Sequence, residues 1–272
     1  MITLLIVFIL GVPLVTSVLT YTLYCYEESN QSGTPLGQLL PNVLRTAIKS
    51  YVYECIILVL HPLGLWPDLW TRPKAGQPIV VLVHGLFHNQ SAWVLFRHWF
   101  QNQGYTVACF SYPSWRTDLE AVESSLKSYL EQILTHYPDQ PIHLVGHSLG
   151  GLLLRGTLSQ LPNVKSIKTL TTLGTPYQGS KLAPFALNSL GHILRFQGEA
   201  VQKIARRPFP APVPLLAITV PTDNMVLPNS ALHCDQLPCT QKTSMPISHV
   251  AMLYSKEIFF LVAHWIKSAP KQ

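Results

Sequence analysis

The chain has 272 residues, of which 48% are hydrophobic and only 12% charged, and this length accommodates one α/β domain of about 200 to 250 residues with a short appendage. The 19 basic and 13 acidic residues leave a formal net charge of +6, yet no block of Lys and Arg indicates nucleic-acid binding. The low charge predicts instead that some apolar surface of the protein contacts something other than water.

The first 26 residues predict a membrane segment. No charged side chain occurs from Ile2 to Tyr26, and about 20 apolar residues in a helix are enough to cross the hydrocarbon core of a bilayer. We therefore expect residues 1–26 to form a transmembrane anchor. A signal sequence that is removed is the alternative, although no Lys or Arg precedes the apolar run and no small-residue cleavage site follows it.

Residues 27–72 are expected to connect this anchor to the main domain. Residues 28–38 are polar and contain Gly and Pro, as in a short linker. In the following apolar run the spacing is helical, but Lys49 and Glu54 interrupt it and Pro62 ends it. These interruptions favour an amphipathic helix on the bilayer surface or against the domain over a second membrane span.

Residues 73–272 predict one α/β domain. Continuous apolar, β-branched runs indicate buried parallel strands, and runs with helical spacing separate them. The predicted strands are residues 78–85, 105–113, 141–148, 164–176 and 214–223. Three predicted helices separate the first four strands, at residues 91–104, 118–137 and 149–161. This alternation is typical of a doubly wound, mostly parallel sheet.

Polar residues follow the predicted strands at the places where ligands bind in open α/β sheets, outside the carboxyl ends of the strands. These residues are His84 and Gly85, Ser148, residues 174–176, and Asp223. Because the carboxyl ends of parallel strands meet at one edge of a sheet, we expect these residues to lie close together.

Ser148 lies at the centre of the pattern Gly146-His147-Ser148-Leu149-Gly150, with a predicted strand before it and a predicted helix after it. The pattern fits G-x-S-x-G, a sharp turn that lifts a serine hydroxyl above the sheet. The two glycines remove side chains where the strand and the helix approach each other. We therefore predict that Ser148 is a nucleophile.

A serine hydroxyl attacks an acyl carbon poorly unless a neutral imidazole accepts its proton. His249, which precedes the final apolar helix, is the expected base, and His233 is the second choice. The imidazole needs a carboxylate that fixes its tautomer. Asp223, at the end of a predicted strand, is expected to supply it, with Asp235 as the alternative.

The negative charge that develops on the attacked carbonyl oxygen needs hydrogen-bond donors already in place. The backbone N–H groups of Leu149, next to the predicted nucleophile, and of Leu86, after His84 and Gly85, are the expected oxyanion donors. His84 is expected to brace its loop rather than to transfer protons. This chemistry requires neither a metal ion nor an organic cofactor.

These motifs, taken together, resemble the successive blocks of bacterial α/β-hydrolase lipases and esterases over roughly residues 76–267. The blocks are VVLVHGLFHNQSAW, HLVGHSLGGLLLR, TLTTLGTPYQGS, TDNMVLP and ISHV. The resemblance implies the α/β-hydrolase fold, with Ser148, Asp223 and His249 as the catalytic triad. Tyr177 departs from the family, which often has histidine after the GTP sequence.

The expected substrate is a lipid acyl ester presented at a membrane, because lipase-like motifs occur together with an anchor. Residues 177–214 form an apolar, basic insert in which Leu187, Leu190 and Leu194 would share one helical face, either as a lid or as an ordinary packing helix.

We expect the protein in a bacterial inner membrane with its catalytic domain in the periplasm. An acyltransferase with the same triad and a non-catalytic membrane-tethered module are the alternatives.

Two of the five cysteines, Cys234 and Cys239, are close in sequence. We expect a disulfide or two free thiols there. A metal site that also uses His233 is less well supported, because the sequence has no second pair of ligands nearby.

Overall fold

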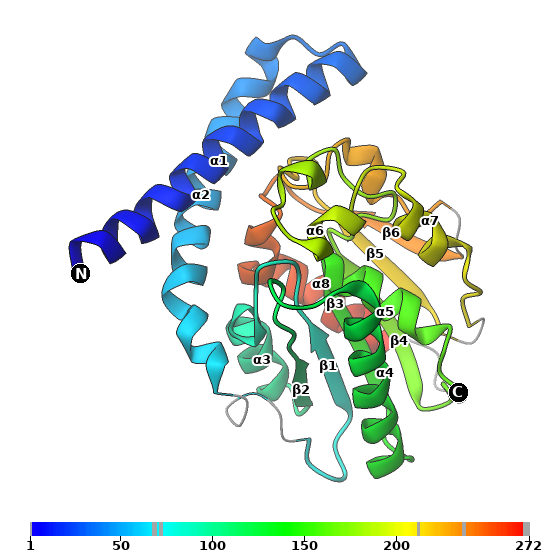
Figure 1. Cartoon of the computed structure of the whole chain (residues 1–272). Coiled ribbons are helices and arrows are strands. Elements are labelled where there is room, and N and C mark those ends of the chain that lie inside the picture. Colours follow the sequence, from blue (N-terminus) through cyan, green and yellow to red (C-terminus); the bar gives the residue numbers. More distant parts are fainter. Residues whose placement is uncertain (1, 67–69, 71–72, 211–212, 236–237, 269–272) are drawn as a thin grey trace.

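The computed structural model describes residues 2–66, 70, 73–210, 213–235 and 238–268, and its main part is a single sheet covered by helices on both faces (Figure 1). The sheet has six parallel strands in the order β2-β1-β3-β4-β5-β6. The strands are β1 (Ile79–Val83), β2 (Thr106–Phe110), β3 (Ile142–His147), β4 (Ile167–Leu173), β5 (Leu215–Thr219) and β6 (Cys239–Thr243). The predicted doubly wound, parallel sheet is confirmed.

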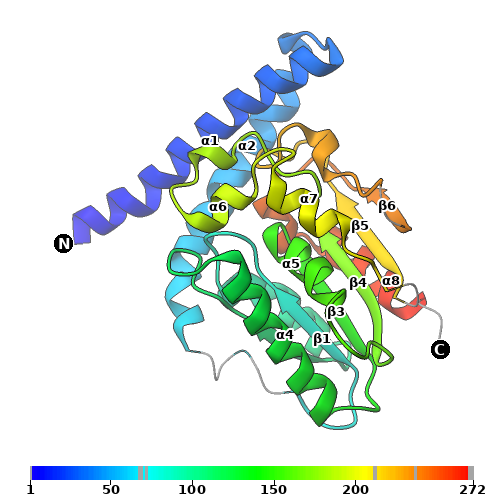
Figure 2. The same cartoon turned by 45° about the vertical axis from the view of Figure 1, so that its right-hand side comes forward.

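Helices cover the two faces of this sheet in the way that its all-apolar strands require. Helices α4 (Leu119–His136) and α5 (Leu149–Leu158) lie in front of the sheet in the view of Figure 2, and α8 (Lys256–Ser268) lies behind it. Helix α3 (Val94–Gln101) packs on the same face as α8, through the contact between the Phe100 and Phe259 rings. The five residues of β1 alternate between the two cores.

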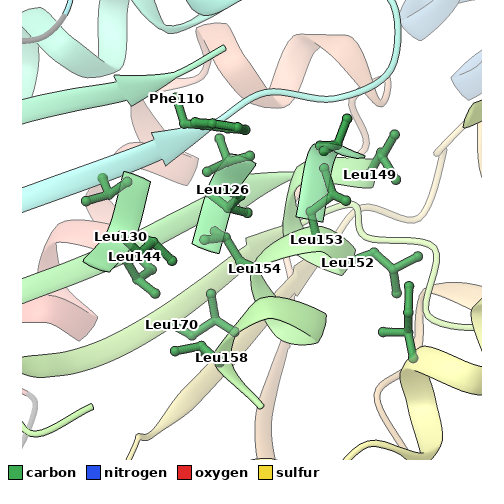
Figure 3. Close-up of a cluster of buried hydrophobic side chains, with 14 of the residues drawn as sticks. Phe110, Leu126, Leu130, Leu144, Leu149, Leu152, Leu153, Leu154, Leu158 and Leu170 are labelled. Atoms are coloured by element: carbon green, nitrogen blue, oxygen red, sulfur yellow. The ribbon is translucent and has the colours of Figure 1, made fainter. Parts of the chain in front are cut away.

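Leucine is the most frequent residue in the core in front of the sheet. Leu126 and Leu130 of α4 and the leucines of α5 converge on Leu144 and Leu170 of the sheet, as Figure 3 shows. Each leucine that is buried completely contributes about 1.5 to 3 kcal/mol relative to an exposed one. This core therefore fixes α5, and the residue that precedes it, against the carboxyl ends of β1 and β3.

The order of the strands reverses between β1 and β3. The chain goes from β1 outward to β2 and then returns to the other side of β1 with β3. At such a reversal the loops after the two strands turn in opposite directions, which opens a ligand site at their carboxyl ends. The loop after β1 and the β3–α5 turn meet there.

The N-terminal part of the chain is a pair of helices, α1 (Ile2–Ser32) and α2 (Leu36–Leu60), that pack against each other. The predicted linker at residues 28–38 is wrong in its extent, because α1 continues through polar residues and ends at Ser32, before Gly33, whose φ is +70°. Among the described residues, α1 is the one helix that is long and apolar enough to cross a membrane.

Two further expectations differ from the structure. Leu187 does not share a helical face with Leu190 and Leu194, because it lies outside any helix, before α6 (Ser189–Ile193), with 86% of its surface exposed. A second short helix of the insert, α7 (Glu199–Arg206), follows. Strand β6 was not predicted. Its four residues after Cys239 are polar and exposed, so it carries no apolar pattern.

The thiols of Cys234 and Cys239 are free. In the described ranges, no group of three or more His, Cys, Asp or Glu residues could hold a metal ion. Cys239 donates from its Sγ to the carbonyl oxygen of Cys234 at 3.5 Å, so the two residues contact each other without a bond between their sulfur atoms.

Candidate active site

Ser148 occupies a strained turn between β3 and α5. Its φ is 53° and its ψ is −123°, a backbone conformation that residues with a Cβ rarely adopt. The close packing of strand and helix imposes this strain. A Cβ added to Gly150 would lie 2.2 Å from the carbonyl oxygen of Val83, and one added to Gly146 would lie 2.5 Å from the backbone nitrogen of Gly151.

Hydrogen bonds hold the serine at this turn. The N–H of Ser148 donates to the carbonyl oxygen of Leu173 at 2.8 Å, and its own carbonyl oxygen accepts from Thr175 Oγ1 at 3.1 Å. Both partners belong to β4 and the loop after it. The main chain of Ser148 is therefore fixed, and the residue is half-buried.

Asp223 and His249 form a buried hydrogen-bonded pair at the same edge of the sheet. The Nδ1 atom of His249 lies 2.6 Å from Oδ2 of Asp223, with Asp223 0% and His249 4% exposed. Oδ1 of Asp223 accepts from the N–H groups of Met225 and Val226, both at 2.9 Å. An ionised carboxylate can only accept, so Nδ1 carries the proton and Nε2 keeps a free electron pair.

The serine turn and the histidine loop are joined through His147. Nε2 of His147 donates to the carbonyl oxygen of His249 at 3.1 Å, and the centres of the two rings are 4.6 Å apart. Burial, together with nearby His249, lowers the pKa of His147 well below its usual value, so its ring is neutral. Within the described residues, no hydrogen bond joins Ser148 Oγ to His249.

Gly174 and Gly85 complete this close arrangement. A Cβ on Gly174 would lie 3.0 Å from Nδ1 of His249 and 3.2 Å from Oδ2 of Asp223. A Cβ on Gly85 would lie 2.9 Å from the Cβ of Ser148. The loop after β1 therefore touches the serine, and the loop after β4 touches the histidine and its carboxylate.

The two backbone N–H groups expected to bind an oxyanion belong to the first residue of α5 and to the loop after β1. Leu149 is the first residue of α5, so its N–H has no partner within the helix and lies at the positive end of the helix dipole. Leu86 follows Gly85, while the neighbouring N–H groups of Phe87 and His88 donate to Ser114 Oγ and to the carbonyl oxygen of Gly85. In the described part of the chain, neither Leu86 nor Leu149 uses its N–H in a hydrogen bond.

His84 lies below this loop and is completely buried. Its Nδ1 donates to the carbonyl oxygen of Gly85 at 2.8 Å, and its Nε2 accepts from the N–H of Tyr112 at 3.2 Å. Burial lowers the pKa of His84 to about 4. A neutral ring with both nitrogens engaged connects the loops after β1 and β2.

The alternatives weighed from the sequence lie elsewhere. His233 and Asp235 are exposed beside β6, and Oδ1 of Asp235 accepts from Gln241. Tyr177, at the position where related sequences often have histidine, is buried and bonds through its hydroxyl to Thr172 Oγ1 at 2.8 Å. None of these side chains contacts Ser148, Asp223 or His249 through a hydrogen bond in the described ranges.

Two residues at this site carry no sequence signal that singles them out. His147 is the free position of the G-x-S-x-G pattern. Asn224 is buried completely, and its Oδ1 accepts from the N–H of His249 at 3.3 Å. Both act through the backbone of His249, a contact between distant segments that no local pattern encodes.

Known proteins resemble the chain in sequence and in structure. A family model described as the alpha/beta hydrolase family matches residues 80–246. The chain is similar to a triacylglycerol lipase of Pseudarthrobacter phenanthrenivorans, with 29% identity over 119 residues, which is 41% of this chain and 37% of the relative. It is also similar to methylesterase 17 of Arabidopsis thaliana, with 31% identity over 97 residues, 34% of this chain and 35% of the relative. The chain thus spans about a third of the length of these curated relatives.

Solved structures share the arrangement of strands and helices. A Bacillus licheniformis lipase in its mature form superimposes with a TM-score of 0.59 and 18% identity, covering 72% of this chain and 94% of that chain. A monoacylglycerol lipase of Paleococcus ferrophilus superimposes with a TM-score of 0.56 and 17% identity, covering 71% and 96%. At these identities the likeness establishes the fold.

Proposed function

The chain belongs to the alpha/beta hydrolase family, and from this membership we propose that it is a membrane-associated serine hydrolase that cleaves the acyl esters of lipids. The observation that carries the proposal is the buried contact of 2.6 Å between His249 Nδ1 and Asp223 Oδ2, at the same sheet edge as the strained Ser148. The lipase and esterase relatives support the choice of a carboxylic ester as substrate.

The reaction starts when Ser148 Oγ attacks the acyl carbon and gives its proton to Nε2 of His249. Asp223 stabilises the imidazolium that forms, and its two backbone donors hold its carboxylate in position. The N–H groups of Leu86 and Leu149 bind the oxyanion of the tetrahedral intermediate. That intermediate collapses when His249 returns the proton to the leaving alcohol, which leaves an acyl group on Ser148.

Water completes the cycle. His249 takes a proton from a water molecule as its oxygen attacks the acyl-enzyme, and a second tetrahedral intermediate forms in the same oxyanion site. Its collapse returns the proton to Ser148 Oγ and releases the fatty acid. The strain at Ser148 is useful in both steps, because a turn held by β3, β4 and α5 keeps the hydroxyl at one position.

Exposed apolar residues support a lipid substrate at a membrane. Most of the first half of α1 is apolar and exposed. Near the site, Phe87 and Trp115 contact each other at 4.6 Å between ring centres while 38% and 65% exposed, and Phe185 of the insert is 62% exposed. We propose that α1 holds the protein in a bacterial inner membrane, with the insert facing the bilayer and the domain in the periplasm.

Replacement of the nucleophile tests this function. The full-length protein in detergent micelles should release free fatty acid from acylglycerol and phospholipid and should react with a fluorophosphonate probe. Ser148→Ala should lower kcat by at least about 10⁴-fold and abolish labelling, because no other group attacks the ester. Ser125→Ala is the matched control, since Ser125 is exposed on α4.

The outcome separates three interpretations. Undiminished labelling of Ser148→Ala would contradict the assignment of the nucleophile. Transfer of the acyl group to an added alcohol in place of fatty-acid release would identify an acyltransferase. A wild-type protein that neither cleaves esters nor reacts with the probe would leave a membrane-tethered module without catalysis.

A further inference from the structure

The second half of α1 contacts the loop that carries Asp223. Thr20, Tyr24 and Glu27 are spaced by four and three residues, so they lie on one face of the helix. Thr20 and Tyr24 contact the segment from Pro221 to Leu227, and Glu27 contacts Lys181. The N–H of Lys181 donates to the carbonyl oxygen of Leu227 at 2.7 Å, so Lys181 is joined to the same segment. The helix predicted as an anchor is therefore also part of the wall around the site.

A chain of hydrogen bonds leads from α1 to the catalytic histidine. Nδ2 of Asn224 donates to Oγ1 of Thr20 at 2.8 Å, and Oδ1 of the same amide accepts from the N–H of His249. Thr20 in turn donates to the carbonyl oxygen of Ser17 at 3.4 Å. Asn224 is 0% exposed and Thr20 is 6% exposed, so no bulk water can replace either partner.

This series of hydrogen bonds determines how the amide of Asn224 is oriented. Oxygen and nitrogen occupy similar positions in an asparagine side chain, and only the partners distinguish the two orientations. With Thr20 as the acceptor for Nδ2, the oxygen faces the N–H of His249. Without that acceptor, the buried amide has no reason to keep its oxygen there, and the main chain of His249 loses the bond that positions it.

A second contact holds the other side of the same loop. The hydroxyl of Tyr24 donates to the carbonyl oxygen of Pro221 at 2.9 Å, two residues before Asp223. The rings of Tyr21 and Tyr24 pack with Leu227, on the far side of Asp223. Glu27 forms an ion pair with Lys181. Helix α1 thus contacts this loop on both sides of Asp223.

We propose that Thr20 and Tyr24 of α1 are positioning residues of the catalytic site, which hold the loop of Asp223 and, through Asn224, the backbone of His249. The proposal rests on the proposed function of this triad. It also implies that the mature enzyme retains α1, because removal of the helix would leave Nδ2 of the buried Asn224 without its acceptor and would remove the bond from Tyr24 to the carbonyl oxygen of Pro221. A membrane helix then serves both as an anchor and as part of the active site.

Two matched pairs of variants in the full-length protein test this proposal. Thr20→Val keeps the shape of the side chain and removes its oxygen, and Thr22→Val makes the same change at an exposed residue whose hydroxyl bonds only to Val18 within the helix. Tyr24→Phe removes the bond to Pro221, and Tyr26→Phe is its control at a residue that is 66% exposed.

Activity is measured on a short, water-soluble ester, so that membrane binding does not affect the result. Thr20→Val should lower kcat by about 10-fold or more with KM unchanged, since small displacements of catalytic groups cost up to about 100-fold. Thr20→Ser should restore kcat, and the Thr22 variant should stay within about twofold of the wild type. Active-site titration with a fluorophosphonate corrects every rate for the fraction of folded enzyme.

Hydrogen exchange gives a second readout that does not depend on catalysis. The amide hydrogen of His249 should exchange faster in Thr20→Val than in Thr22→Val, because its acceptor is no longer held. Equal kcat and equal exchange in the two variants would overturn the proposal. If the wild type lacks hydrolase activity altogether, the proposed function fails, and the exchange at His249 still decides whether α1 positions this loop.

Discussion

Helices α1 and α5 are both dominated by apolar residues, yet they are covered in opposite ways. Every residue of α5 is buried, between α4, α7 and the sheet. In α1 the buried residues are Pro13, Ser17, Thr20, Tyr21, Tyr24 and Cys25, whereas the large aliphatic side chains are exposed. An exposed apolar face of this kind is the feature on which the proposed contact of α1 with lipid rests.

One added methyl group in each helix should produce the largest difference in stability between a change in α5 and a change in α1. Gly150→Ala in α5 would place a Cβ 2.2 Å from the carbonyl oxygen of Val83, and backbone atoms on both sides cannot move apart without breaking the sheet. We expect a loss of more than about 4 kcal/mol of stability and no labelling by fluorophosphonate. Thermal unfolding in detergent and the labelled fraction measure both effects.

Gly11→Ala in α1 is the matched change. A Cβ at Gly11 has nothing within 4 Å, so the helix should gain up to about 1 kcal/mol locally and the protein should keep its activity. If Gly11→Ala unfolds the protein, then α1 is covered by protein in a way that this structure does not contain, and the contrast with α5 is lost.

A charge on the exposed face of α1 tests which solvent this face contacts. Val15 is 68% exposed, and a lysine in the middle of a membrane helix costs about 3 kcal/mol, which corresponds to about a 100-fold weaker partition into lipid. Val15→Lys should therefore float less with vesicles while keeping its activity on a water-soluble ester. Phe260→Lys, at an exposed residue of α8, is the control and should not change flotation.

The smallest expected effect tests whether water is excluded from the core of the sheet domain. The contrast between the buried α5 and the exposed α1 depends on this exclusion. His143 of β3 is buried, and desolvation, assisted by Lys168, lowers its pKa to about 4. The unfolded chain binds a proton near pH 6.5 and the folded chain does not, so stability should fall as the pH drops from about 6.5 to about 4, by at most about 3 kcal/mol from this group.

Denaturant unfolding in detergent at several pH values measures this loss. His143→Gln should make the curve flatter over that range, whereas His136→Gln, at an exposed residue of α4, should leave its slope unchanged. An unchanged slope in His143→Gln would mean that water reaches the start of β3, and that the sheet domain is less tightly closed than its apolar core indicates.

Much of the fold could be predicted because its elements carry local patterns. Strands β1 to β5 are apolar on both faces, so each produces a continuous run, and the turn at Ser148 is marked by two glycines at fixed spacing. Strand β6 was missed because an edge strand is stabilised by its backbone bonds to β5, whatever its side chains are. The end of α1 was missed because polar residues do not stop a helix that packs against a neighbour.

The sequence by itself determined the order of β1 to β5 with α3, α4 and α5 between the first four of them, the position of Ser148 at a strained turn and the apolar face of α1, since each depends on residues close together in the chain. Only the tertiary structure decided that Thr20 meets Asn224, 204 residues away, and that His147 meets the backbone of His249. Such contacts depend on how the sheet, the loop after β5 and α1 pack in space. A hydrogen bond between distant segments leaves no spacing in a sequence from which it could be inferred.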